Sequence, residues 1–165
     1  MAKQHQANGH MDHKMSRRHY AMLVLNVLIS AVIMYFVMFS MIWSTNGFVN
    51  NVNFVYMAVL MAMPMGVLML MMMGPRCPDR RLNAALYAAF GLLFVIAFYA
   101  TRDQSLVGES QFLRSMIPHH SGALTMCRRA SLRDAQVRDL CCKPNGIVNS
   151  QTREIEEMEQ ILDRL

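Results

Sequence analysis

The stretch YAMLVLNVLISAVIMYFVMFSMIW, residues 20–43, decides the fold class, because its 24 residues include no ionisable side chain other than tyrosine. Two further apolar stretches follow at 54–73 and 82–100. A helix rising about 1.5 Å per residue needs about 20 apolar residues to cross the bilayer core. We therefore expect an all-α protein with three transmembrane helices, at 20–43, 54–73 and 82–100. A cleaved signal peptide is the alternative for the first stretch, but the stretch is too long and lacks a small-residue cleavage site.

The distribution of charge predicts the orientation of these helices. Residues 1–19 carry four basic side chains and one acidic side chain. Residues 74–81 carry three basic side chains and one acidic side chain, whereas residues 44–53 carry no charged side chain. Positive charge marks the cytoplasmic side of short loops. We expect a cytoplasmic tail at 1–19 and an exported domain at 101–165. The exported part has nine basic and nine acidic residues, so the net charge of +5 and the pI of 9.3 require no nucleic-acid partner.

Residues 101–165 show a helical pattern. Apolar residues recur at helical spacing over 109–130, and Ser131 with Asp134 resembles a capping box that would begin a second helix. Lys143-Pro144-Asn145-Gly146 should break that helix, and a last helix should follow from Ile147. About 65 residues in two main helices bury little apolar surface, so we expect a homodimer with a four-helix arrangement.

The run Met116-Ile117-Pro118-His119-His120, followed by Met126 and Cys127, is the strongest candidate site. Residues three and four apart share a helix face, so thioether, imidazole and thiol groups cluster without a carboxylate among them. Such donors suit a soft ion such as Cu(I) better than Mg²⁺ or Ca²⁺. The alternative is a structural histidine pair in a helix contact, since adjacent side chains diverge by about 100°.

Catalytic patterns are missing from the sequence. The residues three before His119 and His120 are Met116 and Ile117, so the Glu-x-x-His spacing of di-iron proteins does not occur. There is no His-Glu-x-x-His motif, no Ser/His/Asp arrangement and no Gly-rich phosphate loop. We expect a binding protein and not an enzyme.

Other sulfur and imidazole groups leave alternatives open. Cys127 and Cys141 either form a disulfide or supply thiolates to a metal, or Cys127 is simply a small buried hydrophobic residue. The chain has 18 methionines, eight of them in 54–73, which either line a Cu(I) path or, as we favour, fill space between helices. His5, His10, His13 and His19 are either a weak metal tether or incidental.

The sequence also resembles a known family. The residues that carry the resemblance are Phe112 to His120, Ala123, Met126, Val137-Arg138-Asp139-Leu140, Gln151, Glu154-Ile155 and Met158. They resemble a bacterial family of ferritin-like domains of unknown function, over 103–165. Several members of that family are linked to copper binding and to copper or silver tolerance in the periplasm.

The resemblance implies an exported ferritin-like helical hairpin anchored in the bacterial inner membrane, with copper-handling proteins as partners. Its inward-facing metal ligands would be Met116, His119, His120, Met126 and Met158. The stretch Cys142–Asn145 is about three residues longer than the family's continuous helix, and three residues rotate a helix by about 300°. Met158 would then face away from the histidines unless the turn resets the phase.

These observations predict a membrane-anchored periplasmic protein that binds copper, with Cu(I) favoured, or silver, in sequestration, delivery or tolerance. The alternative function is a metal-free membrane interaction and assembly module with a structural histidine pair.

Overall fold

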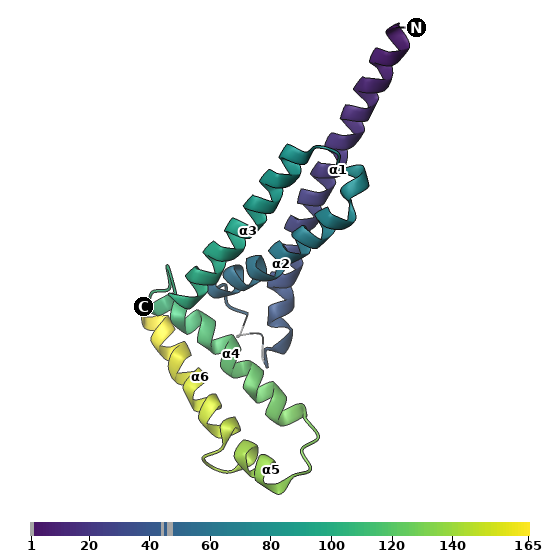
Figure 1. Cartoon of the computed structure of the whole chain (residues 1–165). Coiled ribbons are helices and arrows are strands. Elements are labelled where there is room, and N and C mark those ends of the chain that lie inside the picture. Colours follow the sequence, from purple (N-terminus) through teal and green to yellow (C-terminus); the bar gives the residue numbers. More distant parts are fainter. Residues whose placement is uncertain (1, 44, 46–47) are drawn as a thin grey trace. The chain divides into compact units, whose positions relative to one another are not determined.

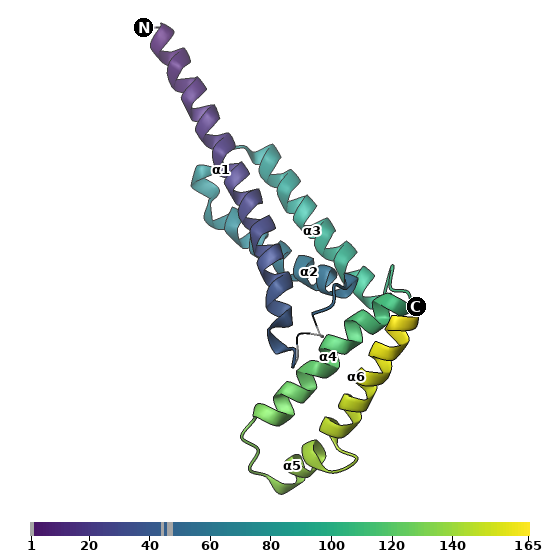
Figure 2. The same cartoon turned by 180° about the vertical axis from the view of Figure 1, so that it is seen from behind.

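The computed structural model describes residues 2–43, 45 and 48–165, and for residues 2–16 and Pro75 it describes the backbone alone. All secondary-structure elements in the described residues are helices, and these residues contain no strand (Figures 1 and 2). In chain order they are α1 (Ala2–Val37), η1 (Met38–Met41), α2 (Val52–Met72), η3 (Gly74–Arg76), α3 (Arg80–Arg102), α4 (Glu109–Arg129), α5 (Ala135–Cys142) and α6 (Ile147–Arg164). The chain divides into two compact units, one of Met1–Met34 with Tyr56–Asp103 and one of Tyr35–Val55 with Gln104–Leu165.

Three helical segments are long and apolar enough to cross a membrane, at Arg17–Met41, Val52–Met72 and Arg80–Arg102. Only 17%, 28% and 11% of their most apolar stretches are buried inside the protein. A soluble helical bundle would cover these side chains, whereas a bilayer solvates them. The arrangement is therefore compatible with three membrane spans, as the composition predicts.

The first unit has a small core to which α1, α2 and α3 all contribute. Leu23 of α1 is fully buried, and it packs in one cluster with Ala62 of α2 and Phe90 of α3. The hydroxyl of Tyr20 donates a 2.7 Å hydrogen bond to Oδ1 of Asn83, whose amide donates to the Cys77 carbonyl at 2.8 Å. These bonds join the middle of α1 to the beginning of α3.

The second unit contains the segment between the first two apolar helices. Aromatic rings hold this segment together: the centroid of Phe39 lies 4.3 Å from that of Phe48 and 4.9 Å from that of Phe54. The hydroxyl of Tyr35 donates to Oδ1 of Asn50 at 2.7 Å. Helices α4 and α6 of the same unit run side by side and form its principal helix pair (Figures 1 and 2).

Helix α5 begins later than the sequence predicts. Its N-cap is Asp134 and not Ser131, because the Asp134 carboxylate accepts hydrogen bonds from the backbone N–H groups of Gln136 and Val137 at 2.9 and 3.0 Å. The break at 143–146 is confirmed. A Cβ on Gly146 would lie 2.8 Å from the Leu140 carbonyl oxygen, so only glycine fits this tight return into α6.

Candidate metal centre

Helix α4 is amphipathic and carries the histidine pair near its middle. Glu109 stands in its first turn and Arg128 and Arg129 in its last, where their charges complement the helix dipole. Its buried face consists of small and apolar residues: Leu113, Ser115, Ile117, Pro118, Ser121, Gly122 and Leu124. The polar and sulfur-bearing candidates lie beside and opposite this face.

The buried face of α4 packs against the segment between α1 and α2. The backbone N–H of Trp43 donates to the Ser121 hydroxyl, and the Thr125 hydroxyl donates to the Met41 carbonyl at 2.9 Å. At the other end of α4, the Asn53 amide donates to the Ser115 hydroxyl at 3.0 Å. The buried face of α4 therefore has packing partners in the same chain.

His120 meets a carboxylate on the neighbouring helix. Its Nδ1 lies 3.0 Å from Oε2 of Glu154 on α6, and the side chains are 14% and 48% exposed, respectively. The contact has ion-pair distance, but it lacks the alignment of a full hydrogen bond, and Nδ1 is shielded from solvent. Glu154 thus lies beside one nitrogen of the imidazole.

Burial determines the protonation of His120. Removal from water lowers the pKa of this imidazole below its ordinary value of 6.5, the charge of Glu154 opposes that shift, and His119 adds to it. The side chain is therefore neutral at neutral pH. A neutral imidazole with one nitrogen directed at a carboxylate retains a lone pair on the other nitrogen.

The remaining candidates differ in exposure. His119 is exposed, and its ring centroid lies 5.9 Å from that of His120, so the two rings are neighbours although they are tilted by 57°. Met116 is half-buried, and Met126 is 56% exposed. Thioether and imidazole groups along one helix are a soft donor set.

Met158 lies on the half-buried stripe of α6. It follows Glu154 by four residues, so the two side chains share a helix face, and Glu154 contacts His120. The turn at 143–146 thus directs this face of α6 toward α4. The rotation expected from the longer turn does not carry Met158 onto the exposed side.

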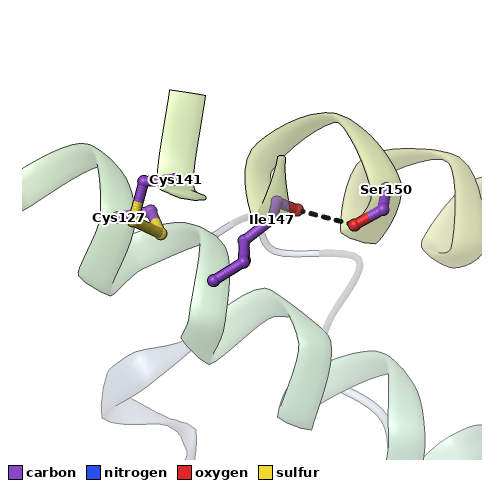
Figure 3. Close-up of a disulfide and its surroundings, with 4 residues drawn as sticks. All are labelled: Cys127, Cys141, Ile147 and Ser150. Atoms are coloured by element: carbon purple, nitrogen blue, oxygen red, sulfur yellow. Dashed lines mark hydrogen bonds between the residues drawn. A yellow bond between two sulfur atoms is a disulfide. The ribbon is translucent and has the colours of Figure 1, made fainter. Parts of the chain in front are cut away.

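Cys127 is joined to Cys141 in a disulfide, which ties α5 to the last turns of α4 (Figure 3). In this oxidised form the Cys127 sulfur cannot serve as a thiolate ligand. Figure 3 also shows Ile147 at the start of α6 directing its side chain toward α4, with its carbonyl accepting from Ser150 at 3.3 Å. Cys142 is a free, exposed thiol.

The donor types limit what this site can hold. Among the described residues, no three His, Cys, Asp or Glu side chains converge as ligands. Met116 and Met126 are further donors on α4, and their thioethers prefer soft ions. His5, His10 and His13 lie outside the residues whose side chains the structure describes.

Glu154 is the residue that sequence reasoning did not assign to the site. It stands in the Gln151-x-x-Glu154 pattern, but nothing local shows that its carboxylate reaches a histidine 34 positions earlier. The one available signal was the helical phase that places Glu154 and Met158 on one face.

The C-terminal part of the chain is similar to a known protein family. Residues 101–162 match the family described as "Domain of unknown function (DUF305)". The chain is also 40% identical over 73 residues to "Uncharacterized protein L153" of Acanthamoeba polyphaga mimivirus, a match that covers 43% of this chain and 46% of that protein. The chain thus spans less than half of that relative's length. No solved structure matches. Residues 101–162, which contain α4, α5 and nearly all of α6, are therefore similar to the DUF305 family.

Proposed function

We propose that the C-terminal helices bind a soft monovalent ion, Cu(I) or Ag(I), and that the three apolar helices anchor this domain at a membrane. The protein would sequester or deliver the ion without turnover. The single observation that carries this proposal is the placement of the Glu154 carboxylate 3.0 Å from Nδ1 of His120.

A carboxylate beside one imidazole nitrogen is the usual companion of a metal-binding histidine. Such a partner fixes the tautomer and the ring orientation and makes the other nitrogen more basic. In this chain, Glu154 would hold the proton on Nδ1 of His120 and leave Nε2 as the donor. The lowered pKa of His120 supports the same role, because metal binding requires the neutral ring.

The neighbouring donors favour a soft ion. Met116 precedes His119 by three residues and His120 by four, so its thioether shares their side of α4. Met126 and Met158 are further thioether candidates. Methionine and imidazole are neutral, and together they suit Cu(I) or Ag(I) better than a hard divalent ion.

The disulfide supports an exported location for this domain. Disulfides persist in oxidising compartments such as the periplasm and are rare in the cytosol. The excess of basic residues at 1–19 and 74–81 favours the same orientation, with 101–165 on the opposite side. Copper-handling proteins of that compartment would be the natural partners.

The test is a titration of the full chain, in detergent and with the disulfide intact, with Cu(I) against a competing chelator. We expect tight binding of one ion per chain or per dimer, and loss of binding in the His119→Ala/His120→Ala variant. Glu154→Gln should weaken binding about 10- to 100-fold. Its matched control is Glu157→Gln, which removes an exposed carboxylate of the same helix. The Cys127→Ser/Cys141→Ser variant should bind with unchanged affinity if methionine and histidine supply the ligands.

The contact between His120 and Glu154 also favours a second candidate function, because it joins α4 to α6 without any metal. On that alternative the domain is an assembly module whose histidine pair is structural. Its partner would be a second copy, since no residue of α6 is fully buried. Equally weak Cu(I) binding by the native chain and the histidine variant, together with a dimer by light scattering, would favour this module.

A further inference from the structure

Two arginines of α4 stack on the single tryptophan of the chain. The guanidinium carbon of Arg128 lies 4.5 Å from the centroid of the Trp43 ring, and that of Arg129 lies 5.8 Å away. Both arginines are exposed, and Trp43 is 41% exposed. All three belong to the same compact unit. Cation–π contact holds the two guanidinium groups together against their mutual repulsion.

The position of Trp43 in the chain places this cluster at the end of an apolar helix. The first membrane-compatible segment ends at Met41, and the second begins at Val52. Tryptophan prefers the headgroup level of a bilayer. The hydrogen bond from Thr125 to the Met41 carbonyl holds the last turns of α4 at the same level.

The charge of this cluster is not neutralised by the protein. Among the described residues, neither Arg128 nor Arg129 has a carboxylate within ion-pair distance, and residues 42–51 contain no ionisable side chain. The C-terminus of α4 offers about half a negative charge, less than two guanidinium groups carry. A guanidinium fork matches phosphate oxygens in geometry and charge.

We infer that Trp43, Arg128 and Arg129 form a binding site for the phosphate of an anionic phospholipid, in the leaflet where the first apolar helix ends. The ring would lie among the headgroups, and the two guanidinium groups would hold the phosphate beside it. The inference rests on the membrane anchoring in the proposed function and is independent of the metal site.

Trp43 reports on this site directly, because no other tryptophan contributes fluorescence. The full chain is reconstituted in phosphatidylcholine nanodiscs that contain either brominated phosphatidylglycerol or the same mole fraction of brominated phosphatidylcholine. We expect brominated phosphatidylglycerol to quench Trp43 more strongly than brominated phosphatidylcholine does. The difference should correspond to about fivefold enrichment of the anionic lipid beside Trp43 for each arginine. High salt should reduce the difference in the native chain.

The matched variants are Arg128→Gln/Arg129→Gln and, as a control, Arg153→Gln/Arg164→Gln, which removes two exposed arginines of α6. The first should abolish the preference for anionic lipid and keep the quenching by phosphatidylcholine; the second should keep both. Equal quenching by the two lipids in the native chain would overturn the inference. So would a change in Trp43 emission on adding inorganic phosphate to neutral nanodiscs, because it would assign the site to a soluble anion.

The absence of quenching by either lipid would overturn the inference together with the membrane anchoring. The Cu(I) titration is unaffected by that outcome, so a failure of the lipid site and a failure of the metal site can be distinguished.

Discussion

Cys141 of α5 is bonded to Cys127 of α4, across only 14 positions of sequence. Helix α5 has eight residues and one buried side chain, Cys141 itself, so little else holds it in place. Closing a loop of about 15 residues stabilises a fold by roughly 3 kcal/mol through the unfolded chain. We expect Cys127→Ser/Cys141→Ser to lower the free energy of unfolding of this domain by about 2–3 kcal/mol.

Hydrogen exchange of the α5 amides in the full chain measures this effect. Cys142→Ser provides the control, because that thiol is free and exposed. Equal protection of α5 in the double variant and in the control would show that the disulfide does not hold this helix.

Gly122 lies where α4 passes the end of η1. A Cβ at this position would meet only Cβ of Met41, at an ordinary contact distance of 3.7 Å. Gly122→Ala should therefore stabilise α4 by about 0.5–1 kcal/mol, since glycine is unfavourable inside a helix. Gly122→Leu should destabilise it by about 1–3 kcal/mol, because the longer side chain collides with Met41. Thermal unfolding of the two variants should change in opposite directions, and a gain in stability from leucine would contradict the contact.

The sequence predicts the local features of this fold well. The three apolar helices, the break at 143–146 and the helical phase of α6 all follow from composition and spacing over a few turns. The N-cap of α5 was misplaced by three residues, because Ser131 and Asp134 both fit a cap and only the structure shows which oxygen meets free N–H groups.

Long-range contacts escaped sequence reasoning. The bond between Trp43 and Ser121 joins positions 78 apart, and Glu154 reaches His120 only after α6 folds back on α4. No sequence motif marks either contact, because each contact depends on how two segments pack together, although each segment is predictable by itself. For the same reason, the packing of the buried face of α4 against Met41, Trp43 and Asn53 was not predicted. The homodimer expected from the size of the domain stays a prediction.

Gly66 permits close packing among the apolar helices. A Cβ there would lie 3.1 Å from the Phe90 ring and from a methyl group of Val27, whereas a Cβ on Gly91 would meet nothing within 4 Å. We expect Gly66→Ala to destabilise the three-helix unit by about 1–3 kcal/mol, because the ring must shift. Gly91→Ala is the matched control and should be neutral or slightly stabilising. Unfolding in mixed micelles measures both, and equal behaviour would show that Gly66 has no packing role.

His120 should make the stability of the domain depend on pH. Its pKa is lowered in the folded state by burial, with Glu154 opposing and His119 assisting the shift. Between the ordinary value of 6.5 and the lowered value, the unfolded chain therefore holds a proton that the folded chain lacks. The free energy of unfolding should fall as the pH falls below about 6.5, by at most about 1.4 kcal/mol per pH unit from this group. Above that pH, both states are neutral at His120 and the dependence ends.

Denaturant unfolding of the metal-free chain between mildly acidic and neutral pH tests this dependence. His120→Gln should remove the slope, because glutamine does not titrate, and His119→Gln should keep most of it. Glu154→Gln should extend the slope to lower pH, because the carboxylate that favours protonation is gone. A domain that became more stable on acidification through His120 would show that the ion pair with Glu154 outweighs burial and raises the pKa of His120. Protons would then compete more strongly with a metal ion for this imidazole.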